Sequence, residues 1–196
     1  MAQTVTTAAD RQATAGASIA APAGGAEPGN IAAPRKRRSY EAGHKPKFLV
    51  VLDETPECDR AVYFASRRAA RVGAVVIMLR VIEPCVRNQV WLKVAEIMRA
   101  EERERSLAML EKFAARAKEV AGVAAEGLIR EGDKAAEILR LIEADEDIAA
   151  IVLAAGTEKE GPGLLVTELA RTAGNYPIPI AIVPGHLSDA ELDALS

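Results

Sequence analysis

Few residues of this 196-residue chain have the types and spacing that enzyme chemistry requires. The two histidines, His44 and His186, lie far apart in the sequence, so no Ser/His/Asp or Cys/His arrangement is apparent. No His and Cys residues share a metal-ligand spacing, and no GxxxxGK phosphate-binding loop occurs. Two carboxylates, Asp53 and Asp133, remain as acid–base candidates, but such side chains more often accept hydrogen bonds from nearby N–H groups. We therefore predict neither a catalytic residue nor a metal site.

The two cysteines, Cys58 and Cys85, are too few for a disulfide framework and form no CxxC pair. Cys58 is expected in the first turn of a helix, where the helix dipole favours a thiolate, so a redox sensor is one interpretation. The favoured alternative is a small apolar residue that fills a contact between helix and sheet. Because the N-terminal residues include Asp10 and Glu27 and lack the apolar core of a secretory signal, we expect a cytoplasmic protein with reduced thiols.

The elements that would position these residues begin at Lys47, where aliphatic runs start to alternate with amphipathic stretches. Continuous apolar runs predict buried strands, and apolar residues three to four apart predict helices. The predicted strands are residues 48–52, 74–82, 125–130, 148–154 and 178–183. The predicted helices are residues 56–72, 90–120, 135–144 and 165–173. The alternation predicts an α/β fold, a parallel sheet with helices on both faces.

Three local signals refine these elements. Thr55 and Pro56 are expected to supply the N-cap and first turn of the first helix. The charge run at residues 99–106 predicts either a solvated face or a break in the second helix. Pro179 lies within the last predicted strand and lacks an N–H, so that strand is expected at a sheet edge or paired with another chain.

Residues 1–46 differ from the rest of the chain, being rich in Ala, Pro and Gly without apolar periodicity, and are predicted to be a disordered basic tail. They hold six Lys/Arg and three Asp/Glu, against 19 and 25 in the remainder. The cluster Arg35–Arg38 could bind nucleic acid, an anionic membrane or an acidic partner. Because four charges give little affinity at physiological salt, a nucleic-acid partner is not expected. No run approaches the ~18 apolar residues of a membrane span, so no membrane partner is expected either.

The region from Lys47 to Gly185 resembles the universal stress protein family (UspA-like). The similarity rests on four segments, Phe48–Asp53 with Pro56 and Ala61, Leu79–Pro84, Arg130–Asp133 leading to Ile138-Leu139, and Pro179–Pro184. The resemblance implies a flavodoxin-like or Rossmann-like five-stranded sheet in the order 3-2-1-4-5. It also implies a homodimer formed partly through the last strand, at Ile178, Ile180 and Ile182. The implied function is a stress-related regulatory role that depends on binding an unidentified protein partner and not on catalytic turnover.

Some members of this family bind ATP beyond the carboxyl ends of the strands, where ligands of such sheets lie. The resemblance matches Val51, Leu52, Asp53 and Val81 to the adenosine side of that site and Gly156 to the first phosphate-loop glycine.

The phosphate side departs from the family pattern. Lys159 stands where a second glycine is expected, Leu164-Leu165 replaces Gly-Ser, and the loop is shorter, so apolar bulk falls where backbone N–H groups should close on phosphate. Gly161 and Gly163 could form a different nest with Lys159, although Pro162 removes one donor.

We therefore predict a degenerate ATP-binding loop that holds no cofactor. The alternative is a nucleotide switch that binds ATP or AMP and hydrolyses ATP slowly at most. If a nucleotide binds, the residues expected to hold it are Val51, Leu52, Asp53, Val81, Gly156, Thr157, Lys159, Gly161, Gly163, Val166 and Thr167.

The predicted organisation is a tail (1–46), a domain (47–185) and a short C-terminal helical tail (186–196). Ser188 and Glu191 form a capping box that begins this last helix. The helix is expected either to fray or to dock on a partner subunit.

Overall fold

A computed structural model describes residues 36–83, 92–157 and 161–196. The strands are β1 (Lys47–Leu52), β2 (Val75–Ile82), β3 (Ala125–Glu131), β4 (Ile148–Ala155) and β5 (Ile180–Pro184). The helices are α1 (Cys58–Val72), α2 (Leu92–Ala121), α3 (Lys134–Ala144), α4 (Leu164–Arg171) and α5 (Asp189–Leu195), with a 3-10 turn η1 (Ala173–Asn175) before β5.

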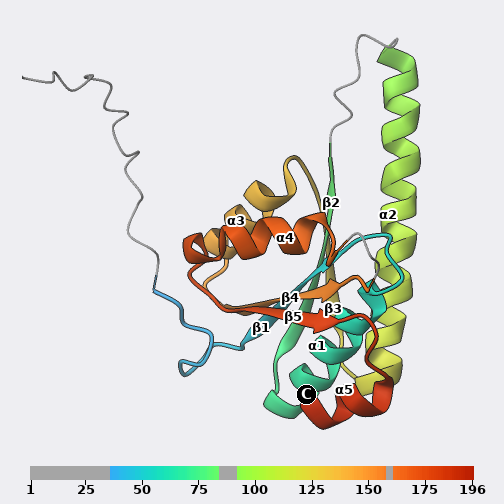
Figure 1. Cartoon of the computed structure of the whole chain (residues 1–196). Helices are drawn as coiled ribbons and strands as arrows, with labels where there is room; N and C mark the ends of the chain where they lie inside the picture. The colour runs from blue at the N-terminus through green and yellow to red at the C-terminus, as the bar shows by residue number, and fades with distance from the viewer. Residues whose placement is uncertain (1–35, 84–91, 158–160) are drawn as a thin grey trace, which may run out of the picture. The chain divides into compact units, whose positions relative to one another are not determined.

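The five strands form one parallel sheet in the order β3-β2-β1-β4-β5, which confirms the predicted flavodoxin-like topology (Figure 1). β1 lies at the centre, because Leu49 pairs with Ile77 of β2 on one side and with Ile151 of β4 on the other. The strand order therefore reverses between β1 and β4, the position at which sheets of this kind receive ligands.

Helices cover both faces of the sheet. α1, α2 and α5 pack on the face that carries Val50 and Met78, and α3 and α4 pack on the face that carries Leu49 and Leu79 (Figure 1). These strand side chains are fully buried, as expected of central strands with apolar residues on both sides.

α2 is one continuous helix of 30 residues, so the alternative of a break at its charge run is wrong. The other alternative, a solvated face, agrees with the exposure of most of these charged side chains. The charges fall at helical spacing: Arg105 pairs with Glu101 at 3.7 Å and with Glu102 at 3.8 Å. Glu102 also accepts a hydrogen bond from Arg80 of β2 at 2.9 Å, which gives the run a fixed partner inside the domain. The charge run therefore supports the helix instead of ending it.

The last strand lies at a sheet edge, as predicted. The predictions for the start of α1 and for the first residue of the last strand need correction. The N-cap of α1 is Glu57, not Thr55. β5 begins at Ile180, so Pro179 precedes the strand and its missing N–H removes no hydrogen bond of the sheet. The Pro179 carbonyl accepts a hydrogen bond from the Ile151 N–H at 3.0 Å. Ile178 consequently lies outside the strand and is buried under α3 and α4.

The prediction of a disordered tail fails for residues 36–46. Arg37 Nη1 donates to the carbonyls of Ile142 and Asp145, at the C-terminal end of α3, at 2.7 and 2.8 Å. The Arg38 N–H donates to the Glu146 carbonyl at 3.1 Å, and His44 Nδ1 lies 2.6 Å from an Asp147 carboxylate oxygen. These contacts join the segment to the α3–β4 connection and engage two members of the basic cluster. Residues 1–35 lie outside the described part of the chain.

The C-terminal helix α5 packs within its own chain. Its capping box, Ser188 with Glu191, forms as predicted. Leu192 is fully buried against α1, Tyr63 Oη donates to Asp193 at 3.0 Å, and Arg67 Nε donates to the same carboxylate at 2.6 Å. The helix therefore docks on α1 of its own chain, an arrangement that neither sequence-based alternative predicted.

Candidate functional site

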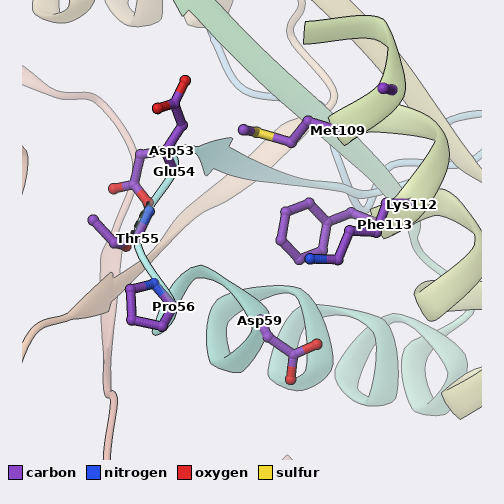
Figure 2. Close-up of a pocket in the computed structure, with 9 residues that line it drawn as sticks. Asp53, Glu54, Thr55, Pro56, Asp59, Met109, Lys112 and Phe113 are labelled. Carbon is purple, nitrogen blue, oxygen red and sulfur yellow. Dashed lines mark hydrogen bonds between the residues drawn. The ribbon is translucent and has the colours of Figure 1, made fainter. Parts of the chain in front are cut away.

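Asp53 follows β1 directly at the carboxyl edge of the sheet. Its Oδ1 accepts hydrogen bonds from the Thr55 N–H at 3.1 Å and from the Thr55 hydroxyl at 2.5 Å (Figure 2). The carboxylate that was expected on the adenosine side thus shapes its own loop, in the manner of an Asx turn.

A hollow of about 350 Å³ opens beside Asp53, between the β1–α1 loop and α2 (Figure 2). Its lining residues are Asp53, Glu54, Thr55, Pro56, Asp59, Ala108, Met109, Lys112 and Phe113. Met109 and Phe113 supply an apolar wall, and the Lys112 ammonium lies 5.3 Å from the Phe113 ring centroid. The α2 residues gave no sequence signal, because a single sequence does not reveal which part of a long helix faces a loop.

Two of the three carboxylates that line this hollow, those of Asp59 and Glu54, have cationic partners, whereas the Asp53 carboxylate accepts, within the described residues, only from Thr55. Asp59 pairs with Arg60 and, at 3.1 Å, with Arg116. Glu54 accepts from Arg80 at 3.0 Å. The hollow therefore combines an apolar wall with acidic groups whose charge is largely compensated.

Arg80 is a buried guanidinium on β2 that the sequence interpretation did not use. It is 8% exposed and lies on the α1–α2 face, where it donates to both Glu54 and Glu102. A charge inside an apolar strand is a usable sequence signal, since a buried cation needs an anionic partner. Arg80 links the β1–α1 loop, β2 and α2, and so fixes one side of the carboxyl edge.

Three residues predicted on the adenosine side are core residues. Val51 and Val81 are buried against the layer of α3 and α4, and Leu52 is buried against α1 and α2. Their side chains are 4%, 2% and 1% exposed. At these positions only backbone atoms remain to meet a ligand.

The loop after β4 is closed by its own backbone. The Gly156 N–H donates to the Pro162 carbonyl at 3.2 Å. A Cβ added to Gly156 would lie 2.9 Å from a carboxylate oxygen of Glu57 and 3.3 Å from the Gly161 carbonyl oxygen. Lys159, the third member of the alternative nest, lies outside the described residues.

The start of α4 also departs from an open phosphate site. Gly161 and Gly163 have φ of +103° and +98°, as a tight connection into a helix requires. Leu164, the first helical residue, is 92% exposed at the rim. The Thr167 hydroxyl donates back to the Gly163 carbonyl at 2.9 Å, and Val166 is buried in the core. Thr157 is exposed.

Burial raises the pKa of the Cys58 thiol to about 12 and outweighs the backbone hydrogen bond at Asp53 and the Arg80 charge, which both lower it. The side chain is 2% exposed and packs between α1 and the sheet. The redox-sensor interpretation is therefore wrong for Cys58, and the packing interpretation holds. Cys85 lies outside the described residues.

The outer edge of β5 carries two of the three residues predicted for a dimer, Ile180 and Ile182, whereas Ile178 is buried in the core. The Ile151 N–H donates to Pro179 O and the Gly185 N–H to Ala155 O, so odd-numbered positions face β4. The backbone of Ile180 and Ile182 consequently faces outward, and the Ile182 side chain is 44% exposed.

No helix in the described part of the chain has the length and apolarity to cross a membrane. No group of three or more His, Cys, Asp or Glu side chains in that part of the chain is placed to hold a metal ion.

The sheet order and the glycine-containing loop after β4 define a doubly wound α/β domain of the flavodoxin-like class. The model of the Universal stress protein family matches residues 46–184, and the chain belongs to that family. No curated protein sequence is significantly similar to the chain.

Solved structures share the fold at low sequence identity. Universal stress protein UspA from Lactobacillus plantarum has a TM-score of 0.61 at 16% identity, covering 70% of this chain and 97% of that one. A universal stress family protein from Burkholderia pseudomallei has a TM-score of 0.55 at 22% identity, with coverages of 70% and 95%. A universal stress protein in complex with cAMP has a TM-score of 0.53 at 19% identity, with coverages of 70% and 96%.

Proposed function

We propose that this chain is a stress-response regulatory protein that acts as a homodimer by binding a protein partner, without holding an adenine nucleotide and without turnover. Family membership supports the stress-response role. We also propose a cytoplasmic location, where the free thiol of Cys58 stays reduced.

The observation that carries the nucleotide-free proposal is the hydrogen bond from the Gly156 N–H to the Pro162 carbonyl. A phosphate nest needs backbone N–H groups that point at the anion and have no other acceptor. Here the N–H of Gly156, the first glycine of the loop, already donates to an acceptor within the loop, and Leu164 is exposed at the start of α4. The described residues therefore fit a closed loop better than a triphosphate cradle.

Calorimetric titration with Mg-ATP and with AMP tests this proposal, together with the nucleotide content of natively purified protein. We expect no co-purified nucleotide and no binding in the micromolar range. Micromolar ATP binding that Asp53→Ala weakens would contradict the proposal and favour an adenine-nucleotide switch. The cAMP complex of a fold relative is the reason to include cAMP in the same titrations.

The homodimer proposal is supported by the free edge of β5. The N–H groups of Ile180 and Ile182 face outward and could donate to a partner strand. Pro184, the next residue that faces the same way, has no N–H, so a partner strand could pair over a short stretch only. Light scattering should detect a dimer for the native chain and a monomer for Ile182→Lys, because a charge at this edge opposes strand pairing. Ile182→Val is the matched control and should remain dimeric. A dimer that persists in Ile182→Lys would show that another surface is used.

A further inference from the structure

Glu57 occupies the N-cap position of α1 without capping the helix. Its backbone is helical, with φ −69° and ψ −16°, and its side chain makes no capping hydrogen bond. Short side chains such as Ser and Asp cap helices because they reach back to the first-turn N–H groups. Glu57 does not do this, so its position needs another explanation.

The side chain of Glu57 lies against the ends of β4 and β5. A Cβ added to Gly185, just after β5, would lie 2.8 Å from the Glu57 Cβ. A Cβ added to Gly156, just after β4, would lie 2.9 Å from the Glu57 Oε1. Real Cβ atoms essentially never approach other heavy atoms this closely. Glu57 therefore packs directly against two glycines, one of which, Gly185, also lies against the Ala155 carbonyl oxygen, 2.7 Å from an added Cβ.

This packing gives Gly156 a reason to be glycine that involves no ligand. In a phosphate loop the missing side chain lets an anion approach the backbone. At Gly156 the missing side chain lets a carboxylate of the same chain approach instead. The group that comes closest to this glycine thus carries the same charge as a phosphate.

We propose that Glu57 is a specificity-determining residue that excludes nucleotide phosphates from the sheet's carboxyl edge. Its carboxylate places a negative charge beside the glycine against which a phosphate chain would lie, and like charges at such short distances repel each other. This inference rests on the proposed nucleotide-free function and names the side chain responsible for it.

The test compares the native chain with Glu57→Gln and Glu57→Ala, using ATP, inorganic triphosphate and adenosine as probes in calorimetric titrations. Glu57→Gln keeps the size of the side chain and its packing against Gly156 and Gly185 while removing the charge. We expect both variants to bind ATP and triphosphate about tenfold or more tightly than the native chain, as removal of one nearby like charge predicts. Adenosine binding should not change. The gain should shrink as salt is raised, because screening weakens charge repulsion.

Glu143→Gln is the matched control, since it removes the same charge from an exposed position on α3 and should leave all three titrations unchanged. Circular dichroism and thermal unfolding establish that each variant is folded. If neither Glu57 variant gains affinity while the native chain binds no ATP, the inference is overturned and the proposed function stands. If the native chain binds ATP in the micromolar range, the proposed function itself fails. A gain that adenosine shares equally would mean that the variants opened apolar space, which also overturns the inference.

Discussion

The two sides of the sheet's carboxyl edge are built differently. Beside β1, a hollow separates the loop that holds Asp53 from α2, and Met109 and Phe113 form its apolar wall. Beyond β4, the loop closes on itself through Gly156 and Pro162, and Glu57 fills the adjoining space. The first region is open, and the second is filled by backbone and side-chain atoms of the chain itself.

This difference shows why a partial motif is a poor guide to a ligand. The open side depends on core residues of α2, and the closed side depends on α1. The residues matched to the ATP site, Val51, Leu52, Asp53, Val81 and Gly156, lie in neither helix.

The largest effect is expected for the reactivity of Cys58, which lies under the open side. With a pKa near 12 instead of the ordinary 9, its thiolate fraction at pH 8 is lower by about 1,000-fold, and alkylation should be slowed at least as much. The rate should keep rising as the pH passes 9, where an exposed thiol would level off. Alkylation of the Cys85→Ser chain, monitored by mass spectrometry, measures this, and the guanidinium-unfolded chain is the control. Fast labelling of the folded chain at pH 8 would contradict the buried-thiol assignment.

The next effect concerns Phe113, which is 6% exposed in the wall of the hollow. Phe113→Ala should lower the free energy of unfolding by about 3–5 kcal/mol, because it removes a buried ring and leaves a cavity. Leu164→Ala, at the rim of the closed loop, should change it by less than about 0.5 kcal/mol, since Leu164 is 92% exposed. Urea unfolding followed by circular dichroism compares the two variants. Similar losses at both positions would mean that Leu164 is covered in solution, for example by a dimer partner.

Most of the fold could be predicted from the sequence because strands such as Phe48–Leu52 and Ile148–Ala154 are continuous apolar runs. Such strands must be buried on both faces, and this favours a parallel sheet between two layers of helices. The element boundaries were less certain where long-range partners decide them. The α2 charge run continues as helix because Arg80 of β2 supplies a partner for Glu102. Residues 36–46 are ordered because Arg37 binds carbonyls at the end of α3. Composition alone reveals neither partner.

The candidate site was predictable only at the level of location. The carboxyl edge follows from the topology, and Asp53 does lie there. The assignment of Gly156 to a phosphate loop assumed that the space beside a glycine is available to a ligand, whereas Glu57 fills it. Val51, Leu52 and Val81 were assigned by position, although buried strands direct those side chains into the core.

A smaller effect is expected when a methyl group is added to the closed side. Gly156→Ala forces the Glu57 carboxylate or the Gly161 carbonyl to move, and should cost about 1–2 kcal/mol of stability. In the Glu57→Ala background the same substitution should cost at least about 0.5 kcal/mol less, because the crowding atom is gone. Gly174→Ala is the matched control, since nothing lies within 4 Å of its added Cβ. Additive costs in this double-mutant cycle would show that Glu57 does not pack against Gly156 in solution.

The smallest effect is expected at Asp53, which belongs to the open side. Asp53→Ala removes the acceptor for the Thr55 N–H and hydroxyl and should cost about 0.5–1.5 kcal/mol, the usual net worth of such bonds. Asp53→Asn keeps an acceptor oxygen and should retain most of that stability, as measured by urea unfolding. If the carboxylate is structural, neither variant changes any nucleotide titration, and the loss in Asp53→Ala tracks the loss in Thr55→Ala. A loss as large in Asp53→Asn as in Asp53→Ala would mean that the negative charge itself is needed, and the open side would then have a role that its hydrogen bonds to Thr55 do not explain.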